Sequence, residues 1–470
     1  MSDLPKGWAT ASLNDLLGAN GLFSDGDWVE SKDQDPNGTN RLLQLADIGD
    51  GLFIDKSSRF VNDEKFSSLN CTELKEGDVL IARMPDPLGR ACLLPAMPQR
   101  CLTVVDVAIF RVEGTGVSNK WLMHFLNSSS VRQEMERNSS GTTRKRISRG
   151  KLGEILLSVP PIAEQVRIAT KLDELMAQVD TLKTRIDGIP TLLKRFRQSV
   201  LAAAVSGKLT EEWRTKKASE GTTSPNKGWK TIRIDQASAD EKYSLAIGPF
   251  GSNLKVSDYR DDGKPLVFVR EIRAECFGDE KTKFITPEKF DDLNAHQISA
   301  GDILVTKMGG PPGDVAIYPA NAPDAVITAD CIKLRVNESI ILREYAYYQM
   351  KSNFFRQKVQ DISAGVAQQK VSLGNFRAIT LLAPSLKEQR EIVRQVGELL
   401  ALADQLEARV KAAKPRIDDL TQSILAKAFR GELVPQDPND EPASVLLERI
   451  KTQRATAPGT KRGRQAATSG

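Results

Sequence analysis

The sequence predicts an α+β fold built from two similar halves, each a mixed α/β domain followed by long helices. Three observations carry this expectation: a repeat at an offset of 224 residues, short β-type runs at the start of each copy, and helical periodicity at its end. The chain has 470 residues, of which 40% are hydrophobic and 27% charged. A chain of this size exceeds a single compact core, so two or more domains are expected.

The repeat is clearest in two helical stretches, "PPIAEQVRIATKLDELMAQVD" from Pro160 and "PSLKEQREIVRQVGELLALAD" from Pro384. A period this long indicates a duplicated domain rather than a solenoid. The same offset joins Gly77 with Gly301, Asp78 with Asp302, Met84 with Met308, Asp106 with Asp330, Arg132 with Arg356, Gly141 with Gly365 and Ser148 with Ser372.

Short β-type runs, broken by Gly, Pro, Asn and Asp, open each copy. The first copy contains "RLLQLADIGDGLFI" and "TVVDVAIFRV", and the second contains "PLVFVREI" and "CIKLRV". Such runs predict a mixed α/β globule of roughly 150 residues at the start of each copy.

A heptad pattern follows each globule. Its apolar residues are spaced 4, 3, 4, 3 and 4 in the first copy, and the second copy repeats them 224 positions later. A sustained period of 3.5 residues favours a left-handed coiled coil, and the plainer alternative is an amphipathic helix packed on its own domain. The predicted seam consists of Ile168, Leu172, Leu175, Val179, Leu182, Ile186, Ile392, Val396, Leu399, Ala403, Leu406 and Val410.

A second helix is expected in each copy, preceded by Pro190 or Pro415 and ending at Gly207 or Gly431. An apolar residue two places after each glycine suggests a Schellman-type cap. A short helix around "ASVLLERIKTQRA" is expected near the end of the chain. The expected segments are residues 1–157 and 221–381 for the globules, 158–220 and 382–455 for the helical regions, and 456–470 for a basic, disordered tail.

Composition argues against several classes of protein. Five cysteines form no CxxC pair, so they are expected to be reduced and mostly buried. The presence of only two histidines, His124 and His296, argues against zinc sites and histidine acid-base pairs. The N-terminus has no signal-peptide pattern and no stretch is apolar enough to span a membrane, which predicts a cytoplasmic protein. The net charge of +5 is a modest bias towards polyanions.

Catalytic motifs are missing from the sequence. It contains neither a GxxxxGK[ST] phosphate loop nor a G-x-S-x-G elbow. The glycine-rich "MGGPPGD" at Met308 has the counterpart "MPDPLGR", which suits a hairpin loop better than a nucleotide site. A nuclease-like set of Asp324, Asp330 and Lys333 has the wrong spacing and falls in an expected buried strand. We therefore predict no catalytic site and no metal site.

Two heptad helices of one chain, joined through a whole domain, can run antiparallel about a pseudo-two-fold axis, with one globule at each end. The helix from Ala163 to Asp187 would be about 37 Å long at 1.5 Å per residue. One turn of B-DNA is about 34 to 36 Å. Such a spacer would present two globules to one face of a duplex, which predicts a bipartite target with an unread gap.

Several features together resemble the DNA specificity subunit of type I restriction-modification enzymes. They are the tandem globules, the P-x-x-x-E-Q pattern at Pro160 and Pro384, the "GDVLIAR" and "GDILVTK" strands, and "LLKRFRQSVLAAAVSGKLTEEW" from Leu192. The segments Leu192–Trp213 and Leu420–Leu433 are similar to the enteric type IA group. The similarity covers almost the full chain.

The resemblance implies two target recognition domains joined by spacer helices, in a subunit without catalytic activity. It implies duplex DNA as a partner, together with two methyltransferase subunits that bind S-adenosylmethionine and methylate adenine N6. It also implies two ATP-driven restriction subunits. S-adenosylmethionine, ATP and Mg²⁺ are then expected in those partners, and this chain is expected to hold no cofactor. The methyltransferase must extrude its adenine from the duplex.

Candidate DNA contacts follow from the chemistry of readout, in which Arg and Lys suit phosphate or guanine while Asn and Gln suit adenine. The clearest candidates are matched loops, "SGTTRKRIS" and "AGVAQQKVS", and a solvated charged loop is the ordinary alternative. The loop residues are Arg144, Lys145, Arg146, Gln368, Gln369 and Lys370, and further candidates near strand ends are Arg83, Lys307, Gln44 and Arg270.

Family context assigns Gln198, Ser199, Gln422 and Ser423 to docking of the methyltransferase, with core packing as the alternative. The competing function is a bivalent protein-protein adaptor whose coil sets the distance between two gripped partners. Steep salt dependence and a fixed bipartite DNA motif would separate the two functions, because an adaptor would show neither. An enzyme with an unrecognised site is a weaker third alternative, which would need activity from the isolated chain.

Overall fold

The computed structural model describes residues 4–85, 87–141, 144–219, 228–365 and 369–456. The chain forms two compact units: unit 1 comprises Met1–Ile186 and Ala412–Gly470, and unit 2 comprises Asp187–Lys411. This division falls near the middle of both long helices. The domain boundaries expected from sequence lie instead where the long helices begin, and they stay predictions. No described helix has both the length and the apolar character needed to cross a bilayer.

Unit 1 contains a mixed α/β globule. Its strands are β1 (Ala9–Ser12), β2 (Leu22–Asp25), β3 (Asn40–Leu43), β4 (Arg59–Val61), β5 (Val79–Ala82), β6 (Ala91–Leu93), β7 (Cys101–Thr103), β8 (Val107–Arg111) and β9 (Leu156–Val159). Its short helices are η1 (Leu13–Leu16), η2 (Ser31–Asp33), η3 (Leu45–Asp47), α1 (Asp63–Ser68), α2 (Asn119–Leu126), α3 (Ser129–Arg137) and α4 (Arg149–Gly153). The largest sheet has the order β2-β8-β5-β6 and is antiparallel; β4-β3-β7 and β1-β9 form two smaller sheets.

Unit 2 contains a second globule. Its strands are β10 (Lys230–Arg233), β11 (Leu245–Ile247), β12 (Lys264–Val267), β13 (Lys283–Ile285), β14 (Gln297–Ile298), β15 (Ile303–Thr306), β16 (Met308–Gly309), β17 (Val315–Ile317), β18 (Ala325–Ile327), β19 (Cys331–Leu334), β20 (Gln369–Lys370) and β21 (Thr380–Ala383). Its short helices are α6 (Glu211–Ser219), α7 (Ile234–Ala237), η4 (Val256–Asp258), α8 (Val269–Ala274), α9 (Pro287–Asp292), η5 (Asn294–His296), α10 (Arg343–Lys351), α11 (Asn353–Asp361) and α12 (Leu373–Ala378).

The duplication inferred from sequence is confirmed in the folds of the two units. The sheet β2-β8-β5-β6 corresponds strand for strand to β11-β19-β15-β17, and β1-β9 corresponds to β10-β21. The register agrees as well, since Leu80 lies opposite Ile109 in unit 1 and Leu304 lies opposite Lys333 in unit 2. Each copy is therefore one mixed α/β domain, as predicted.

Two long helices, α5 (Ile162–Ser206) and α13 (Leu386–Phe429), run through Pro190 and Pro415 without a break. The expectation of two separate helices per copy was wrong, and so was the expected spacer helix from Ala163 to Asp187, because α5 continues to Ser206 and has 45 residues. A proline removes one helical hydrogen bond and crowds the carbonyl four residues earlier, but a helix can bend and absorb this when its flanks are packed. In α5 the flank beyond the proline is held by Leu193, Val200 and Leu201, which are all buried.

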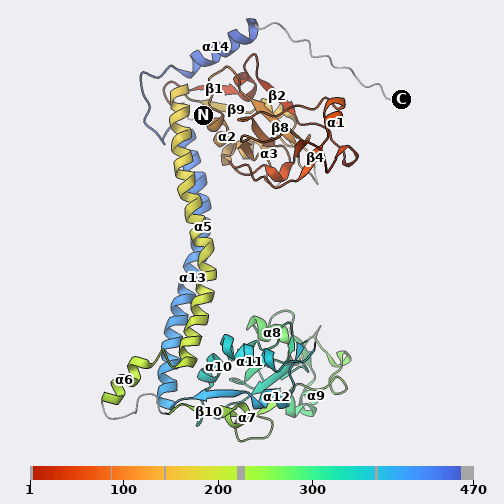
Figure 1. Ribbon diagram of the computed structural model, residues 1–470, viewed down its shortest axis with the longest axis vertical. Coiled ribbons are helices and arrows are strands. Elements are labelled where there is room, and N and C mark those ends of the chain that lie inside the picture. Colours follow the sequence, from red (N-terminus) through yellow and green to blue (C-terminus); the bar gives the residue numbers. More distant parts are fainter. Residues whose placement is uncertain (1–3, 86, 142–143, 220–227, 366–368, 457–470) are drawn as a thin grey trace. The chain divides into compact units, whose positions relative to one another are not determined.

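Within each unit the two long helices lie side by side and antiparallel (Figure 1). In unit 1, Ile168 belongs to the same buried cluster as Ala428, and Lys183 Nζ lies 2.9 Å from Asp418 Oδ1. In unit 2, α5 begins a second set of contacts in which Arg197 Nη2 lies 2.7 Å from Asp404 Oδ1. Within unit 1, residue numbers rise along α5 from Ile168 to Lys183, while those of the neighbouring residues on α13 fall from Ala428 to Asp418. The two helices are therefore antiparallel.

A buried glutamate fastens the start of each long helix to its globule. Glu164 Oε2 accepts a hydrogen bond of 3.0 Å from the indole of Trp8, and Glu388 Oε2 accepts one of 3.1 Å from the indole of Trp229. In unit 2 the other oxygen of Glu388 also accepts a 2.6 Å bond from Arg214. The repeated Glu of the P-x-x-x-E-Q pattern is thus a fold determinant.

The repeated Gln of that pattern joins the helix to a second segment. Gln165 Oε1 accepts a 2.9 Å bond from the backbone N–H of Ser118, and Gln389 Oε1 accepts one of 2.7 Å from Leu342. Each amide nitrogen donates to the carbonyl of the proline five residues earlier, at 2.9 and 2.8 Å. Because all these groups are buried or half-buried, the bonds satisfy polar atoms that water cannot reach.

The end of α13 has the predicted Schellman cap. Gly431 has a φ of 76°, its N–H donates to Ala428 O at 3.2 Å, and the N–H of Glu432 donates to Lys427 O at 2.9 Å. Beyond it, α14 (Ala443–Thr456) packs on the first elements of unit 1, where Figure 1 shows it above β1. The expected basic tail lies outside the described residues.

The cysteines are mostly buried, as expected, and both histidines contact neighbouring groups. All five cysteines are free thiols, and Cys92, Cys101 and Cys331 are buried. His124 Nε2 lies 2.9 Å from Asp173 Oδ1, and His296 Nδ1 lies 2.6 Å from a backbone carbonyl. Within the described part of the chain, no three His, Cys, Asp or Glu side chains are grouped as metal ligands would be.

Candidate nucleic-acid interface

The first predicted DNA-contacting loop is a closed turn. Ser140 and Arg146 exchange two backbone hydrogen bonds of 2.9 and 2.8 Å, which hold the ends of the loop together. Gly141 follows with a φ of 105°, and a Cβ there would lie 2.5 Å from Arg144 O, so only glycine fits this position. Arg144 and Lys145 are exposed at the tip, and no hydrogen bond or ion pair of their side chains is recorded among the described residues.

The matching loop of unit 2 is closed in the same way. Ala364 and Lys370 exchange backbone bonds of 3.1 and 3.0 Å, and Gly365 has a φ of 112°. Gln369 and Lys370 are exposed and form β20, which pairs with β16 at Met308. Gln368 lies outside the described residues. The antiparallel pairing of β15 with β17 agrees with the expectation that the glycine-rich stretch between them belongs to a hairpin loop.

Both loops rest on the same backbone frame at the end of a central strand. The residue after each loop donates to that strand, Ile147 to Arg83 O at 3.1 Å and Val371 to Lys307 O at 3.0 Å. The N–H of Arg83 in turn donates to Asp106 O at 2.9 Å, the first residue before β8. The two units therefore carry different side chains on the same backbone arrangement.

Arg83 and Lys307, which we predicted as DNA contacts, point into this frame. Their residues are 3% and 6% exposed. Arg83 Nη1 lies 2.9 Å from Asp25 Oδ1, and Lys307 Nζ donates to Ala329 O at 3.3 Å. Burial lowers the pKa of both side chains. In the structure they support the turn beneath the loop, and direct contact with DNA stays a prediction.

A hollow of about 640 Å³ in unit 1 brings together three of the predicted readers, Gln44, Arg144 and Arg146. The sequence placed Gln44 about a hundred residues from the other two. Met84 and Trp28 line the same hollow. A concave surface that carries an amide, two guanidinium groups and an aromatic ring has the chemistry for reading base edges.

Acidic side chains reduce the positive charge of this hollow. Asp27, Glu30 and Asp106 also line it, and Arg146 Nη2 lies 3.4 Å from Asp106 Oδ1. Burial raises the pKa of Asp27 to about 6. The guanidinium of Arg146 is therefore partly compensated and held in place, while Arg144 and Lys145 supply the free positive charge.

Arg270, the last predicted reader, is tied to its own helix. Its Nε donates to Glu271 Oε1 and its Nη2 to Lys281 O, both at 2.7 Å. The neighbouring Arg273, which sequence reasoning did not select, comes closer to the candidate loop. Its Nη2 lies 2.8 Å from the position a Cβ on Gly309 would take, beside the β16–β20 pair.

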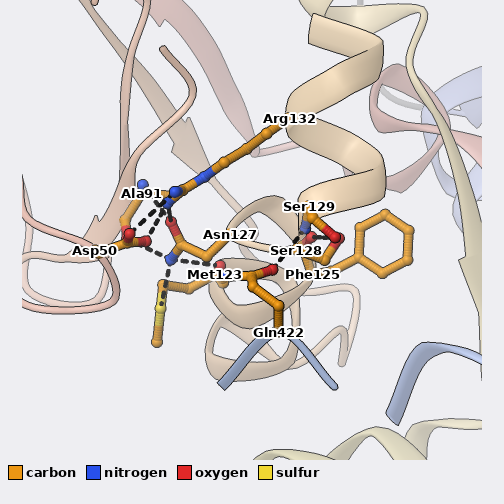
Figure 2. A network of polar contacts seen from close by, with 9 residues as sticks. All are labelled: Asp50, Ala91, Met123, Phe125, Asn127, Ser128, Ser129, Arg132 and Gln422. Carbon is orange, nitrogen blue, oxygen red and sulfur yellow. Dashed lines mark hydrogen bonds and ion pairs between the residues drawn. The ribbon is translucent and has the colours of Figure 1, made fainter. Parts of the chain in front are cut away.

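Figure 2 shows a polar network that links the long helix α13 to the globule of unit 1. Gln422 Oε1 accepts a 2.9 Å bond from the N–H of Ser129 at the start of α3. Farther along α3, Arg132 donates to Asn127 Oδ1 at 2.8 Å and pairs with Asp50. Asp50 belongs to the loop that follows η3, and Gln44 immediately precedes η3.

The four residues assigned to partner docking differ in their surroundings. Ser199 and Ser423 are exposed on the long helices, so they are available to a partner. Gln198 is half-buried, and its Oε1 has no hydrogen-bond partner among the described residues. Gln422 serves its own unit through Ser129, which supports the packing alternative for that residue.

Sequence comparison places the chain beside known proteins. It matches the family described as "Type I restriction modification DNA specificity domain" over residues 5–191 and 252–413. It is 34% identical to the StySPI specificity subunit of Salmonella potsdam over 75% of each chain. It is 33% identical to the EcoKI specificity subunit of Escherichia coli K12 over 78% of this chain and 79% of that protein.

Structural comparison agrees on the fold. A chain from a solved structure concerned with assembly and conformational transition of the type I R-M system superimposes with a TM-score of 0.65 at 17% identity. The match covers 92% of this chain and 100% of that one.

Proposed function

Since the chain belongs to the type I restriction-modification DNA specificity family, we propose that it reads a bipartite, gapped DNA target, one half-site with each unit. The observation that carries this proposal is the duplicated loop. In both units a closed turn with long polar side chains stands on the same backbone frame, yet its residues differ, Arg144 to Arg146 against Gln369 and Lys370. A shared frame with different readers suits two half-sites of different sequence.

We further propose that α5 and α13 form an antiparallel coiled coil that sets the gap. The seam residues Ile168, Leu172, Ile392 and Val396 are fully buried, and ion pairs join the helices within each unit. The heptad spacing and these contacts together support a spacer of fixed length.

The chain is proposed to act without catalysis, in the cytoplasm, as the assembly centre for two methyltransferase and two restriction subunits. S-adenosylmethionine, ATP and Mg²⁺ would be held by those partners. Support for docking on the helices comes from exposed apolar side chains that recur at the repeat offset. Leu182 and Leu406 are 43% and 40% exposed, and Phe196 and Leu420 are 36% and 44% exposed. A pseudo-symmetric chain offers such a surface twice.

The test is a comparison of genomic N6-methyladenine in the native host before and after deletion of this gene. Loss of one bipartite, gapped, adenine-methylated motif is the expected result, and restoring the gene should restore the motif. The methyltransferase subunit must be shown to be present in both strains. If it is present and the methylation pattern is the same with and without this chain, the proposed function is wrong.

A further inference from the structure

Each unit leaves one large aromatic side chain exposed just after corresponding strands, β2 in unit 1 and β11 in unit 2. Trp28 of unit 1 and Phe250 of unit 2 are both 67% exposed. Most large aromatic residues of a folded protein are substantially buried, because exposing such a ring to water is unfavourable. The exposure of two aromatic rings on corresponding segments is therefore not explained by the stability of the fold and suggests a role in binding.

The two segments are equivalent because each contains a glycine that contacts the corresponding backbone segment of its own unit. Gly26 N donates to Val107 O at 2.8 Å and Gly248 N to Cys331 O at 3.1 Å, and these acceptors are related by the 224-residue repeat. A Cβ on Gly26 would lie 2.2 Å from Val104 O, and one on Gly248 would lie 1.9 Å from Thr328 O. Only glycine allows this approach, and the aromatic residue follows two positions later in both units.

The backbone frame brings this segment to the loop. In unit 1, Val104 to Asp106 contact the glycine on one side and Arg83 and Arg146 on the other, with Arg146 Nη2 donating to Val105 O at 3.1 Å. Trp28 consequently lines the hollow that also holds Gln44, Arg144 and Arg146. In unit 2, Lys307 N donates to Asp330 O at 2.7 Å, which repeats the frame in the segment that Gly248 approaches at Thr328.

Local hydrogen bonds hold the indole of Trp28 and the backbone that carries Phe250. The indole N–H of Trp28 donates to Glu30 Oε1 at 3.3 Å. The carbonyl of Phe250 accepts from the N–H of Asn253 at 2.8 Å, which fixes the backbone turn that carries the ring. A preset ring loses less conformational freedom when it meets a ligand.

We propose that Trp28 and Phe250 are base-stacking wedges, one for each half-site. Each ring enters the duplex beside its loop and stacks on a base at a step that opens there. The inference rests on the proposed function. Its ligand class is duplex DNA rather than protein because the hollow that Trp28 lines also holds Gln44, Arg144 and Arg146. Apolar side chains are used in this way to unstack base steps, and bases of any identity offer a stacking face.

The residue types fit this role better than direct readout. Trp and Phe share a flat apolar face but share no hydrogen-bonding group, so their common function at equivalent positions is stacking. Opening a step near the target adenine lowers the work that remains for a methyltransferase that extrudes the base. The wedge thus links recognition by this chain to chemistry in its partner.

The experiment uses the full chain in complex with its methyltransferase subunit, without S-adenosylmethionine. The probe is a duplex that carries the motif found by methylation mapping, with 2-aminopurine, whose fluorescence rises on unstacking, placed at successive positions of each half-site. Wild-type complex should raise fluorescence at one step in each half-site. Trp28→Ala should abolish the rise in one half-site only and weaken binding about 10- to 100-fold, and Phe250→Ala should do the same in the other.

Trp28→Phe and Phe250→Trp keep a stacking face and should retain both signals. Phe354→Ala is the matched control, because that ring is 61% exposed in unit 2 but is carried by α11. The wedge is overturned if both alanine variants bind within twofold of wild type with unchanged fluorescence. It is also overturned if Trp28→Ala releases the methyltransferase subunit while the fluorescence pattern persists, since the ring would then contact protein. Failure of the wild-type complex to bind the motif would instead refute the proposed function.

Discussion

At the scale of single residues, the candidate interface separates side chains that hold a loop from side chains that project from it. Arg83 and Arg146 contact backbone carbonyls and carboxylates, whereas Arg144 and Lys145 are exposed at the tip. The free energy of binding to phosphate comes from released counterions, so it depends on charges that reach the surface. Arg144 and Lys145 are the residues that meet this condition.

Replacing Arg144 and Lys145 together with alanine should therefore weaken binding to all duplexes at low salt. If each contacts one phosphate, the slope of log K against log salt should fall by about two. Titrations at several salt concentrations measure it. Lys120→Ala provides the control, because Lys120 is an exposed cation of the same unit that pairs with Asp173. A slope that stays the same in the double variant would remove this loop from the interface.

The stability of unit 2 should depend on pH through Lys333, which is 5% exposed in β19. Burial lowers the pKa of Lys333 from 10.5 to about 8. Between these values the folded chain binds fewer protons at Lys333 than the unfolded chain does, so the contribution of this lysine to the free energy of unfolding rises with pH across that window. Below it, the buried charge is a full cost to the folded state.

Lys333→Ile copies the residue of the other unit, where Ile109 is buried. It should raise the free energy of unfolding near pH 7 by about 1 to 2 kcal/mol and remove the contribution of Lys333 to its pH dependence. Urea unfolding near pH 7 and near pH 10 measures both effects. The exposed strand residue Lys230 gives the control Lys230→Ile. Equal pH dependence in wild type and Lys333→Ile would contradict the assignment.

Residue contacts also show what could be read from the sequence. The repeat offset correctly paired the two loops, because loop closure depends on Gly141 and Gly365, whose identity is visible in the sequence. The sequence did not reveal that the side chain of Arg83 points inward. All four residues of β5 are buried, so alternation gives no outward face from which to count. Trp28 was missed because one ring in an irregular segment leaves no periodic signal.

At the scale of elements, the long helices combine a buried seam with exposed apolar positions. Of the predicted heptad seam, Ile168, Leu172, Ile392 and Val396 are buried. Leu182 and Leu406, which were also assigned to it, are 43% and 40% exposed, so the seam does not bury them and the coiled coil stays a prediction. The prediction that each long helix ends before its proline was wrong because the rule for helix termination considers local hydrogen bonding alone. In α5, residues such as Val200 are still packed beyond Pro190. Leu182 and Leu406 leave apolar surface for another helix.

Changing Leu182 and Leu406 to aspartate should disrupt docking of the methyltransferase subunit. A carboxylate in an apolar contact is strongly unfavourable, while the same change on an exposed position costs the isolated chain little. Co-purification and mass measurement of the complex should show fewer methyltransferase copies per chain. Leu52→Asp alters a side chain that is 66% exposed in the globule and should leave the complex intact. Full assembly of the double variant would place the docking surface elsewhere.

At the scale of the whole molecule, the proposed spacer ties a length of helix to a length of DNA. Inserting one heptad at matched positions of α5 and α13 lengthens the helix by about 10 Å, the rise of about three base pairs. The methylated motif should keep both half-sites and gain about three base pairs in its gap. Methylation mapping in the host reads this directly. Insertion in one helix alone breaks the seam and should abolish methylation, and an unchanged gap with both insertions would refute the spacer.

The nesting of unit 2 within the sequence of unit 1 has a consequence for how the protein is made. Unit 2 is complete once residue 411 has left the ribosome, whereas unit 1 lacks its second helix and α14 until the last part of the chain is translated. Ile168 and Leu172 belong to the same buried cluster as Leu425 and Ala428, so part of their apolar surface stays open throughout synthesis of unit 2. Premature termination would leave a fully folded second reader attached to an unfinished first one, a product that chaperones and proteases would recognise by that open surface.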